Sequence, residues 1–336
     1  MQVILPYLLL IIGFVFLVKG ADWFVDGSSS AARLLKVPSI VIGLTIVAFG
    51  TSAPELAVSL TAALNGSNGI AVGNVVGSNF FNLLMIIGIC ALIKPMHINK
   101  NMLKSEFPIS IVCGILLFVM LADATVFNKS ENILSHLDGI ILLVLFALFV
   151  VAQVRNALHG RKQAISDAAM PESEVQVVDT EADEIKVLSP AKSVVLIIVG
   201  LVLVIFGGDL VVDNATIIAQ SFGLSDAFIG LTIVAFGTSL PELFTSIVAA
   251  RKGENDLALG NVVGSNIFNI LLILGVSSAI HPITVGVDSL IDLAILTVMS
   301  IITYIMAWHK CKLNRIEGCI MIAMYLGYVG YLVSQI

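Results

Sequence analysis

Apolar stretches of about 20 residues recur along most of this chain, and they restrict its fold more than any other feature. A helix of that length crosses a hydrocarbon core about 30 Å thick. Residues 140–151 and 194–205 are apolar on every side, whereas strands of a membrane barrel would alternate over about 10 residues. The sequence therefore predicts an all-α polytopic membrane protein.

The amino-acid composition limits the classes of protein to which this chain can belong. Apolar residues make up 58% of the 336 positions and charged residues only 12%, against about 25% charged in a soluble domain. This excludes a secreted disulfide scaffold, a nucleic-acid binder and a cytosolic enzyme. The net charge of -6 is local, because residues 163–185 hold seven acids and no base.

Ten hydrophobic spans fit the sequence. They cover residues 3–30, 40–63, 69–93, 105–122, 134–154, 191–218, 227–250, 256–280, 288–308 and 316–334. Alternate connections between these spans hold 15 of the 17 Lys and Arg residues. Because Lys and Arg favour the cytoplasmic side, both termini are expected outside an inner or plasma membrane and the acidic loop in the cytoplasm.

The chain contains an internal duplication. A shift of 187 residues aligns 42–88 with 229–275, and 32 of these 47 positions are identical. Each unit holds about five spans, so the second enters the membrane from the opposite face, as in the inverted repeats of secondary transporters. We expect a first five-helix repeat at 1–155, an acidic cytoplasmic loop at 156–190 and a second five-helix repeat at 191–336.

The duplicated segment places a carboxylate deep in a span. The first copy reads GLTIVAFGTSAPELAVSL and the second GLTIVAFGTSLPELFTSI. Thr51 and Ser52 precede Glu55 by four and three residues, so all three share one helical face, and Ala48 lies just above them. At about 1.5 Å per residue, Glu55 lies roughly 20 Å into its span. An ionisable residue at that depth indicates a functional site.

Proline adds a break beside each glutamate. Pro54 has no N–H and crowds the carbonyl of Gly50, and Pro241 repeats the arrangement next to Glu242. The pattern predicts free carbonyls over residues 48–51. Non-helical backbone at membrane depth is tolerated only where it lines a cavity or is buried in protein.

A polar stripe on the following span faces this break. Its members recur every four residues within GNVVGSN motifs, and they are Asn74, Ser78 and Asn82 in the first copy and Asn261, Ser265 and Asn269 in the second. The combined donors are oxygens, with no thiolate or imidazole. Such sets select hard cations, and six to eight oxygens with carboxylates suit Ca²⁺. Asp22, Asp26, Asp209 and Asp213 lie nearer span ends, where we expect structural or interfacial roles.

Two motifs, GxxxxAFGTSxPE and GNxxGSNxxN, each occur twice. Together they resemble the α-repeats of the cation/Ca²⁺ exchanger superfamily, especially its compact prokaryotic Na⁺/Ca²⁺ exchanger branch, over nearly the whole chain. The resemblance implies that Glu55 and Glu242 bind Ca²⁺ with the carbonyls of Thr51 and Thr238. It also implies further ligands, with Ala48, Ser52, Ser78, Ala235, Ser239 and Ser265 joining Thr51 and Thr238 at Na⁺, and Asn82 and Asn269 at the centre. Several family members carry Asp where this chain has Asn269.

The sequence thus predicts an antiporter that exchanges Ca²⁺ for Na⁺ by alternating access, with inorganic cations and the lipid bilayer as partners and no cofactor. An H⁺/Ca²⁺ antiporter using the same two glutamates is an alternative. A Ca²⁺-selective channel would take its carboxylate ring from several subunits. A hydrolase would need a nucleophile beside a base, and the five histidines lie mostly at span ends.

Overall fold

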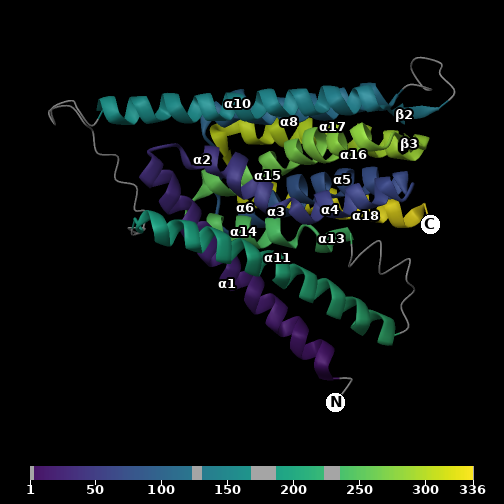
Figure 1. Ribbon diagram of the computed structural model, residues 1–336, viewed down its shortest axis with the longest axis horizontal. Coiled ribbons are helices and arrows are strands. Elements are labelled where there is room, and N and C mark those ends of the chain that lie inside the picture. The colour runs from purple at the N-terminus through teal and green to yellow at the C-terminus, as the bar shows by residue number, and fades with distance from the viewer. Residues whose placement is uncertain (1–3, 123–130, 168–186, 223–234, 336) are drawn as a thin grey trace.

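The protein is a helical bundle, seen here in a computed structural model that describes residues 4–122, 131–167, 187–222 and 235–335. Most helices run along one direction, and α1 and α11 cross them obliquely on one side (Figure 1). The longer helices are α1 (Ile4–Leu35), α5 (Asn68–Phe80), α8 (Glu106–Leu121), α10 (His136–Asp167), α11 (Pro190–Ser221), α15 (Asn255–Phe268), α17 (Val287–Trp308) and α18 (Arg315–Ser334).

Shorter elements complete the bundle. The helical segments are α2 (Ser39–Ile42), η1 (Gly43–Val47), α3 (Ala48–Thr51), α4 (Ala53–Leu64), η2 (Phe81–Ile86), α6 (Ile87–Ile93), α7 (Lys100–Lys104), α13 (Ala235–Gly237), α14 (Leu240–Arg251), η4 (Asn269–Leu274), α16 (Gly275–Ile280) and η5 (His309–Cys311). The strands are β1 (Met96–His97), β2 (Asn132–Leu134), β3 (Ile283–Val285) and β4 (Lys312–Leu313).

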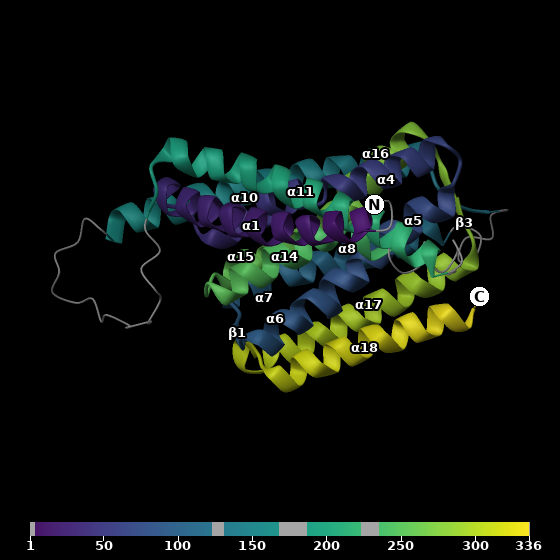
Figure 2. The same cartoon turned by 90° about the horizontal axis from the view of Figure 1, so that it is seen from below.

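Spanning helices follow the sequence prediction closely. In the described residues, eight helices are long and apolar enough to cross a membrane, and the bent pair Ser39–Thr51 and Ala53–Leu64 makes a ninth. The predicted tenth span, 227–250, begins outside the described residues and continues in α13 and α14. Both chain ends lie toward the end of the bundle that carries β2 and β3 (Figures 1 and 2).

Helices α1 and α11 pack against each other in antiparallel directions through glycines. A Cβ added at Gly20 would lie 2.8 Å from the carbonyl oxygen of Gly200. One added at Gly200 would lie 2.5 Å from the backbone nitrogen of Phe24. The two backbones therefore approach to a distance that only glycine allows, as small residues do between membrane helices.

Contacts between the two halves occur in mirrored pairs. Helix α6 of the first half packs against α18 of the second, and α16 packs against α10. The strands follow the same rule, because β1 pairs with β4 and β2 with β3, both antiparallel. Figure 2 places β1 and β3 at opposite ends of the bundle. At the centre of the bundle lie α4, α5, α14 and α15, which hold the duplicated motifs.

Candidate functional site

Each duplicated glutamate follows a break in its helix. Ser52 (φ -83°, ψ 8°) separates α3 from α4, and the two parts are bent by 49°. Ser239 has nearly the same backbone angles (φ -91°, ψ 6°) just before α14. Pro54 and Pro241 stand at the start of the helices that follow, where the missing N–H is tolerated. The predicted break is confirmed in both copies.

The backbone at the break differs in one respect from the sequence prediction. The carbonyl of Ala48 is not free, because it accepts the N–H of Ser52 at 3.0 Å. In the second copy the N–H of Ser239 instead bonds the carbonyl of Phe236 at 3.2 Å. The carbonyl of Gly50 also accepts a backbone N–H at the end of α3, so fewer carbonyls over residues 48–51 are free than the proline argument predicts.

Each glutamate is held by a serine from the other copy. Ser52 Oγ donates to Glu242 Oε1 at 3.0 Å, and Ser239 Oγ donates to Glu55 Oε1 at 3.0 Å. Ser265 Oγ also reaches Glu242 Oε1 at 3.4 Å, while the hydroxyls of Ser239 and Ser78 lie 3.2 Å apart. The two breaks therefore face each other, and neither copy alone completes the surroundings of its own carboxylate.

Both carboxylates are fully buried and only partly satisfied. Glu55 and Glu242 have 0% of their surface exposed, and Oε2 of each has no hydrogen-bond partner among the residues that the structure describes. Neither forms an ion pair in the described part of the chain. Burying an ionised carboxylate without a counter-charge is very costly. This oxygen-only donor set with spare acceptor atoms fits a hard cation.

Asparagines brace the glutamate helices from the neighbouring spans. Asn74 Nδ2 donates to Ser59 Oγ at 2.9 Å and to the carbonyl of Glu55 at 3.3 Å. Asn261 makes the corresponding bonds to Ser246 Oγ at 2.9 Å and to the carbonyl of Glu242 at 3.4 Å. The polar stripe predicted on α5 and α15 therefore does face the broken helices.

The central asparagines are buried but differ in their bonding. Asn269 Nδ2 donates to Asn79 Oδ1 at 2.9 Å, whereas its own Oδ1 has no partner within the described segments. Neither amide atom of Asn82 has a partner among the described residues. Both side chains place an unpaired amide oxygen in the interior.

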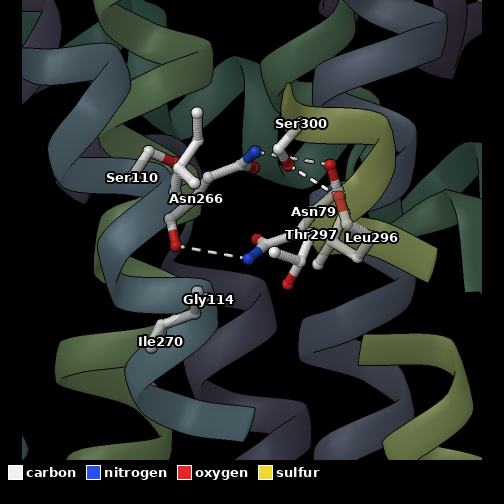
Figure 3. Close-up of a pocket in the computed structure, with 9 residues that line it drawn as sticks. Asn79, Ser110, Gly114, Asn266, Ile270, Leu296, Thr297 and Ser300 are labelled. Carbon is white, nitrogen blue, oxygen red and sulfur yellow. Dashed lines mark hydrogen bonds between the residues drawn. The ribbon is translucent and has the colours of Figure 1, made fainter. Parts of the chain in front are cut away.

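Sequence reasoning missed Asn79 and Asn266, which link α5 to α15. Each donates its Nδ2 to the other's backbone carbonyl at 3.3 Å, as Figure 3 shows. They line a cavity of about 10 Å³ with Ser110, Thr297 and Ser300, which is about the room one water needs. Their position in the duplicated GNVVGSN motif was the available signal.

The remaining predicted residues fall into three groups. Ala48, Thr51, Ser78 and Ser265 are buried, and the Thr51 hydroxyl lies 3.1 Å from Asn261 Oδ1. Thr238 is half-buried, and its hydroxyl has no partner among the described residues. The side chain of Ala235 lies outside the described part of the structure.

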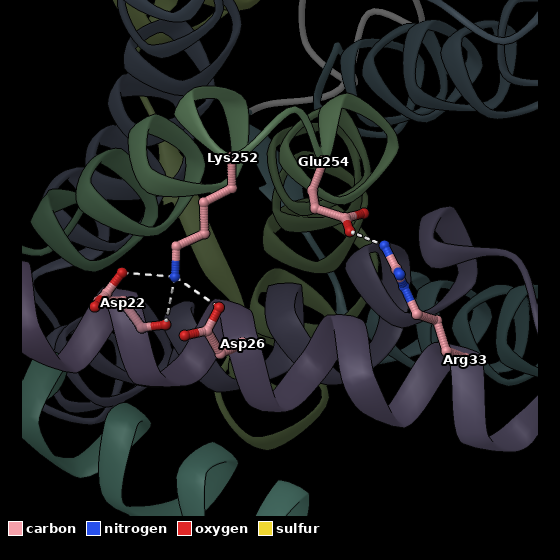
Figure 4. A network of polar contacts seen from close by, with 5 residues as sticks. All are labelled: Asp22, Asp26, Arg33, Lys252 and Glu254. Atoms are coloured by element: carbon pink, nitrogen blue, oxygen red, sulfur yellow. Dashed lines mark hydrogen bonds and ion pairs between the residues drawn. The ribbon is translucent and has the colours of Figure 1, made fainter. Parts of the chain in front are cut away.

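Two of the outlying aspartates form ion pairs away from the glutamates. Lys252 Nζ lies 2.6 Å from Asp22 Oδ1 and 2.7 Å from Asp26 Oδ1, which ties α1 to the end of α14 (Figure 4). Arg33 and Glu254 pair nearby at 3.2 Å. Asp22 and Asp26 thus have an ion-pair partner, although α1 continues to Leu35 and both lie well inside this helix rather than near its end.

Comparison with known proteins assigns a family. The family model described as sodium/calcium exchanger protein matches residues 5–155 and 192–334. The inner membrane protein YrbG of Escherichia coli is 36% identical over 90% of this chain and 88% of its own length. The sodium/calcium exchanger MaX1 of Methanosarcina acetivorans is 34% identical over 96% of this chain and 97% of its own.

Solved structures agree with the sequence comparison. A structure of the sodium-calcium exchanger NCX_Mj, soaked without Na⁺ and Ca²⁺, superposes with a TM-score of 0.80 at 32% identity. The match covers 98% of this chain and 99% of that one. The likeness therefore extends over the whole bundle and includes both broken helices.

Proposed function

The chain belongs to the sodium/calcium exchanger protein family and is an antiporter, and on this premise we propose that Glu55 and Glu242 jointly bind the Ca²⁺ that it exchanges for Na⁺. One observation carries the proposal. Both carboxylates are fully buried without a cationic partner in the described chain, and each keeps one oxygen unpaired. Two negative charges balance one Ca²⁺, which removes the cost of leaving them buried alone.

Neutral oxygens complete the proposed site. In the part of the chain that the structure describes, the central amide oxygens of Asn82 and Asn269 are buried and unpaired, as is the hydroxyl of Thr238. We assign Ca²⁺ to the glutamates with the carbonyls of Thr51 and Thr238. Na⁺ is assigned to the surrounding ligands, which are Ala48, Thr51, Ser52, Ser78, Ala235, Thr238, Ser239 and Ser265. Such oxygens suit both hard cations.

Coupling follows from shared ligands. Thr51 and Thr238 are assigned to both ions, and both ions are held by the negative charge of the same two carboxylates, so Na⁺ and Ca²⁺ compete for the site rather than occupy it together. If the protein changes its open side only with the carboxylates neutralised, each Ca²⁺ released on one face must be replaced by Na⁺ before the return step. This is the alternating access expected of inverted-repeat transporters.

We extend the proposal to the architecture. Two inverted five-helix repeats at 1–155 and 191–336 would give ten membrane helices, joined by the acidic segment 156–190. The mirrored pairing of β1 with β4 and of β2 with β3 supports this arrangement. Both chain ends lie toward one end of the bundle, and the distribution of Lys and Arg supports an orientation with these ends outside the cell and the acidic segment in the cytoplasm.

Ca²⁺ uptake into proteoliposomes tests the function. An outward Na⁺ gradient at equal pH is expected to drive Ca²⁺ uptake that saturates and stops when internal Na⁺ is replaced by choline. A pH gradient without Na⁺ is expected to drive little uptake. Uptake driven by the pH gradient alone would favour the H⁺/Ca²⁺ alternative. Ca²⁺ flux that needs no counter-ion would favour a channel.

The acidic segment is expected to be dispensable for ion movement. Residues 163–185 hold seven acids and no base, and at this low hydrophobicity they cannot bury a core. Replacement of residues 163–185 by a Gly/Ser linker of equal length should leave the Na⁺-driven rate within about twofold of the native rate. Loss of transport in a folded, inserted variant would instead assign the segment a role in gating.

A further inference from the structure

Asn79 and Asn266, whose side chains each donate to the other's backbone carbonyl, form a bridge between α5 and α15. This bridge also contacts the proposed ion site at one point. Asn79 Nδ2 donates to the backbone carbonyl of Asn266, and Asn79 Oδ1 accepts from Asn269 Nδ2. Asn79 therefore belongs to the bridge between α5 and α15 and is also the hydrogen-bond partner of the Asn269 amide.

The bridge fixes which way the central amide faces. A carbonyl accepts hydrogen bonds and never donates, so the carbonyl of Asn266 holds the nitrogen of Asn79 and turns Asn79 Oδ1 toward Asn269. Because Asn79 Oδ1 is an acceptor, the Asn269 amide can hydrogen-bond it only through its nitrogen. The oxygen of Asn269 is thereby left unpaired and buried, one turn beyond Ser265, which bonds Glu242.

Among the described residues, Asn269 donates to Asn79 and to none of the other lining groups of the cavity. Thr297 and Ser300 donate their hydroxyl protons to carbonyls of their own helix, at 2.8 Å each. They come from α17, on the side where Asn79 and Asn266 face each other (Figure 3). The orientation of Asn269 thus depends on Asn79 rather than on the cavity as a whole.

The mirrored contact is absent in this conformation. By the 187-residue shift, Asn82 should donate to Asn266 Oδ1. Instead, Asn266 Oδ1 and both amide atoms of Asn82 have no partner in the described residues. The duplicated motif therefore orients one central amide and leaves the other unoriented.

We propose that Asn79 is a positioning residue for ion binding, which holds the Asn269 amide with its oxygen toward the transported cation while Asn82 stays unoriented. This rests on the proposed function, because it takes Asn269 as a ligand. Asn79 itself contacts no ion. Its effect passes through Asn269, and the two central ligands are therefore not equivalent despite their identical sequence surroundings.

The experiment compares Ca²⁺ affinity in the purified full-length protein by equilibrium ⁴⁵Ca²⁺ binding. Asn79→Ala is expected to weaken Ca²⁺ binding about tenfold, as loss of one ordinary hydrogen bond would. Asn266→Ala is the matched control, because it also removes one bond of the bridge but not the partner of Asn269. It should stay within about twofold of native binding. Equal losses in both variants would reduce Asn79 to a structural role.

A double-mutant cycle separates positioning from packing. If Asn79 acts through Asn269, Asn79→Ala should add no further loss to Asn269→Ala. Additive losses would overturn the proposal. Asn79→Asp keeps an acceptor of the same shape for Asn269 Nδ2 and should retain the affinity that Asn79→Ala loses. This comparison also serves if the alanine variant fails to fold.

The outcomes distinguish failure of the positioning role of Asn79 from failure of the proposed ion site. If Asn269→Ala leaves Ca²⁺ binding unchanged, the central amide is no ligand and the proposed site fails at that residue. If Asn269→Ala weakens binding and Asn79→Ala does not, the ion site stands and the positioning role is overturned.

Discussion

Replacement of Glu55 or Glu242 by glutamine is expected to abolish Ca²⁺ exchange while the protein remains folded. One remaining carboxylate cannot offset the charge of a dehydrated Ca²⁺. Removing one partner from a buried charge pair costs about 3–5 kcal/mol, which corresponds to a loss of roughly 10²-fold to several thousandfold in affinity. Na⁺-driven ⁴⁵Ca²⁺ uptake into proteoliposomes measures the effect. Because each glutamate receives a serine from the other copy, both substitutions should be equally severe.

Glu106 offers a matched control. It is a glutamate on α8 with 6% of its surface exposed, and its Oε2 also lacks a partner among the described residues. Among the described residues, its side chain makes no hydrogen bond to the glutamates or serines of the proposed site. Glu106→Gln removes the same charge from another buried position, and uptake should continue. Near-native flux in Glu55→Gln or Glu242→Gln would contradict the site, as would equal loss in all three variants.

Substitution of Gly200 by valine is expected to separate α1 from α11. Even the Cβ would lie 2.5 Å from the backbone nitrogen of Phe24 and 2.8 Å from the carbonyl of Gly20. Backbone atoms cannot rotate away, so the helices must move apart. Overpacking of a tight contact costs about 1–3 kcal/mol or more. Thermal unfolding in detergent should therefore show a clear loss of stability, together with reduced uptake.

Gly327→Val provides the comparison for this experiment. Gly327 lies within α18, and an added Cβ there meets no atom within 4 Å. The same side chain in the same type of element should change stability only by the small difference in helix propensity. If both variants unfold at the same temperature, the close packing of α1 on α11 contributes nothing.

Local chemistry in the sequence predicts the broken helices well. Pro54 and Pro241 remove a donor at fixed positions, so the break before each glutamate can be placed to within a residue or two. Fewer helical hydrogen bonds are lost at the break than predicted, because the N–H of Ser52 still donates to the carbonyl of Ala48. That detail depends on how far the preceding helix is held by its neighbours, which no local pattern contains.

The sequence could not predict which side chains hydrogen-bond to one another from different helices. Helical spacing groups Ser52 with Glu55, three residues later, yet Ser52 donates to Glu242. Spacing identifies neighbours on one helix, whereas partners on another helix depend on the packing of both. Asn79 escaped notice for a related reason. It follows Ser78 by one residue, which turns it about 100° round the helix and away from the polar stripe at four-residue steps.

The exchange of serines between the two glutamates also bears on how the duplicated copies can change over time. A substitution at Ser52 alters the surroundings of Glu242, and one at Ser239 alters those of Glu55. Neither copy is free to diverge at these positions without consequences for the other. Differences between the copies fall elsewhere, as where exposed Leu64 corresponds to Arg251. The two serine positions are therefore constrained together, because each shapes the carboxylate of the other copy.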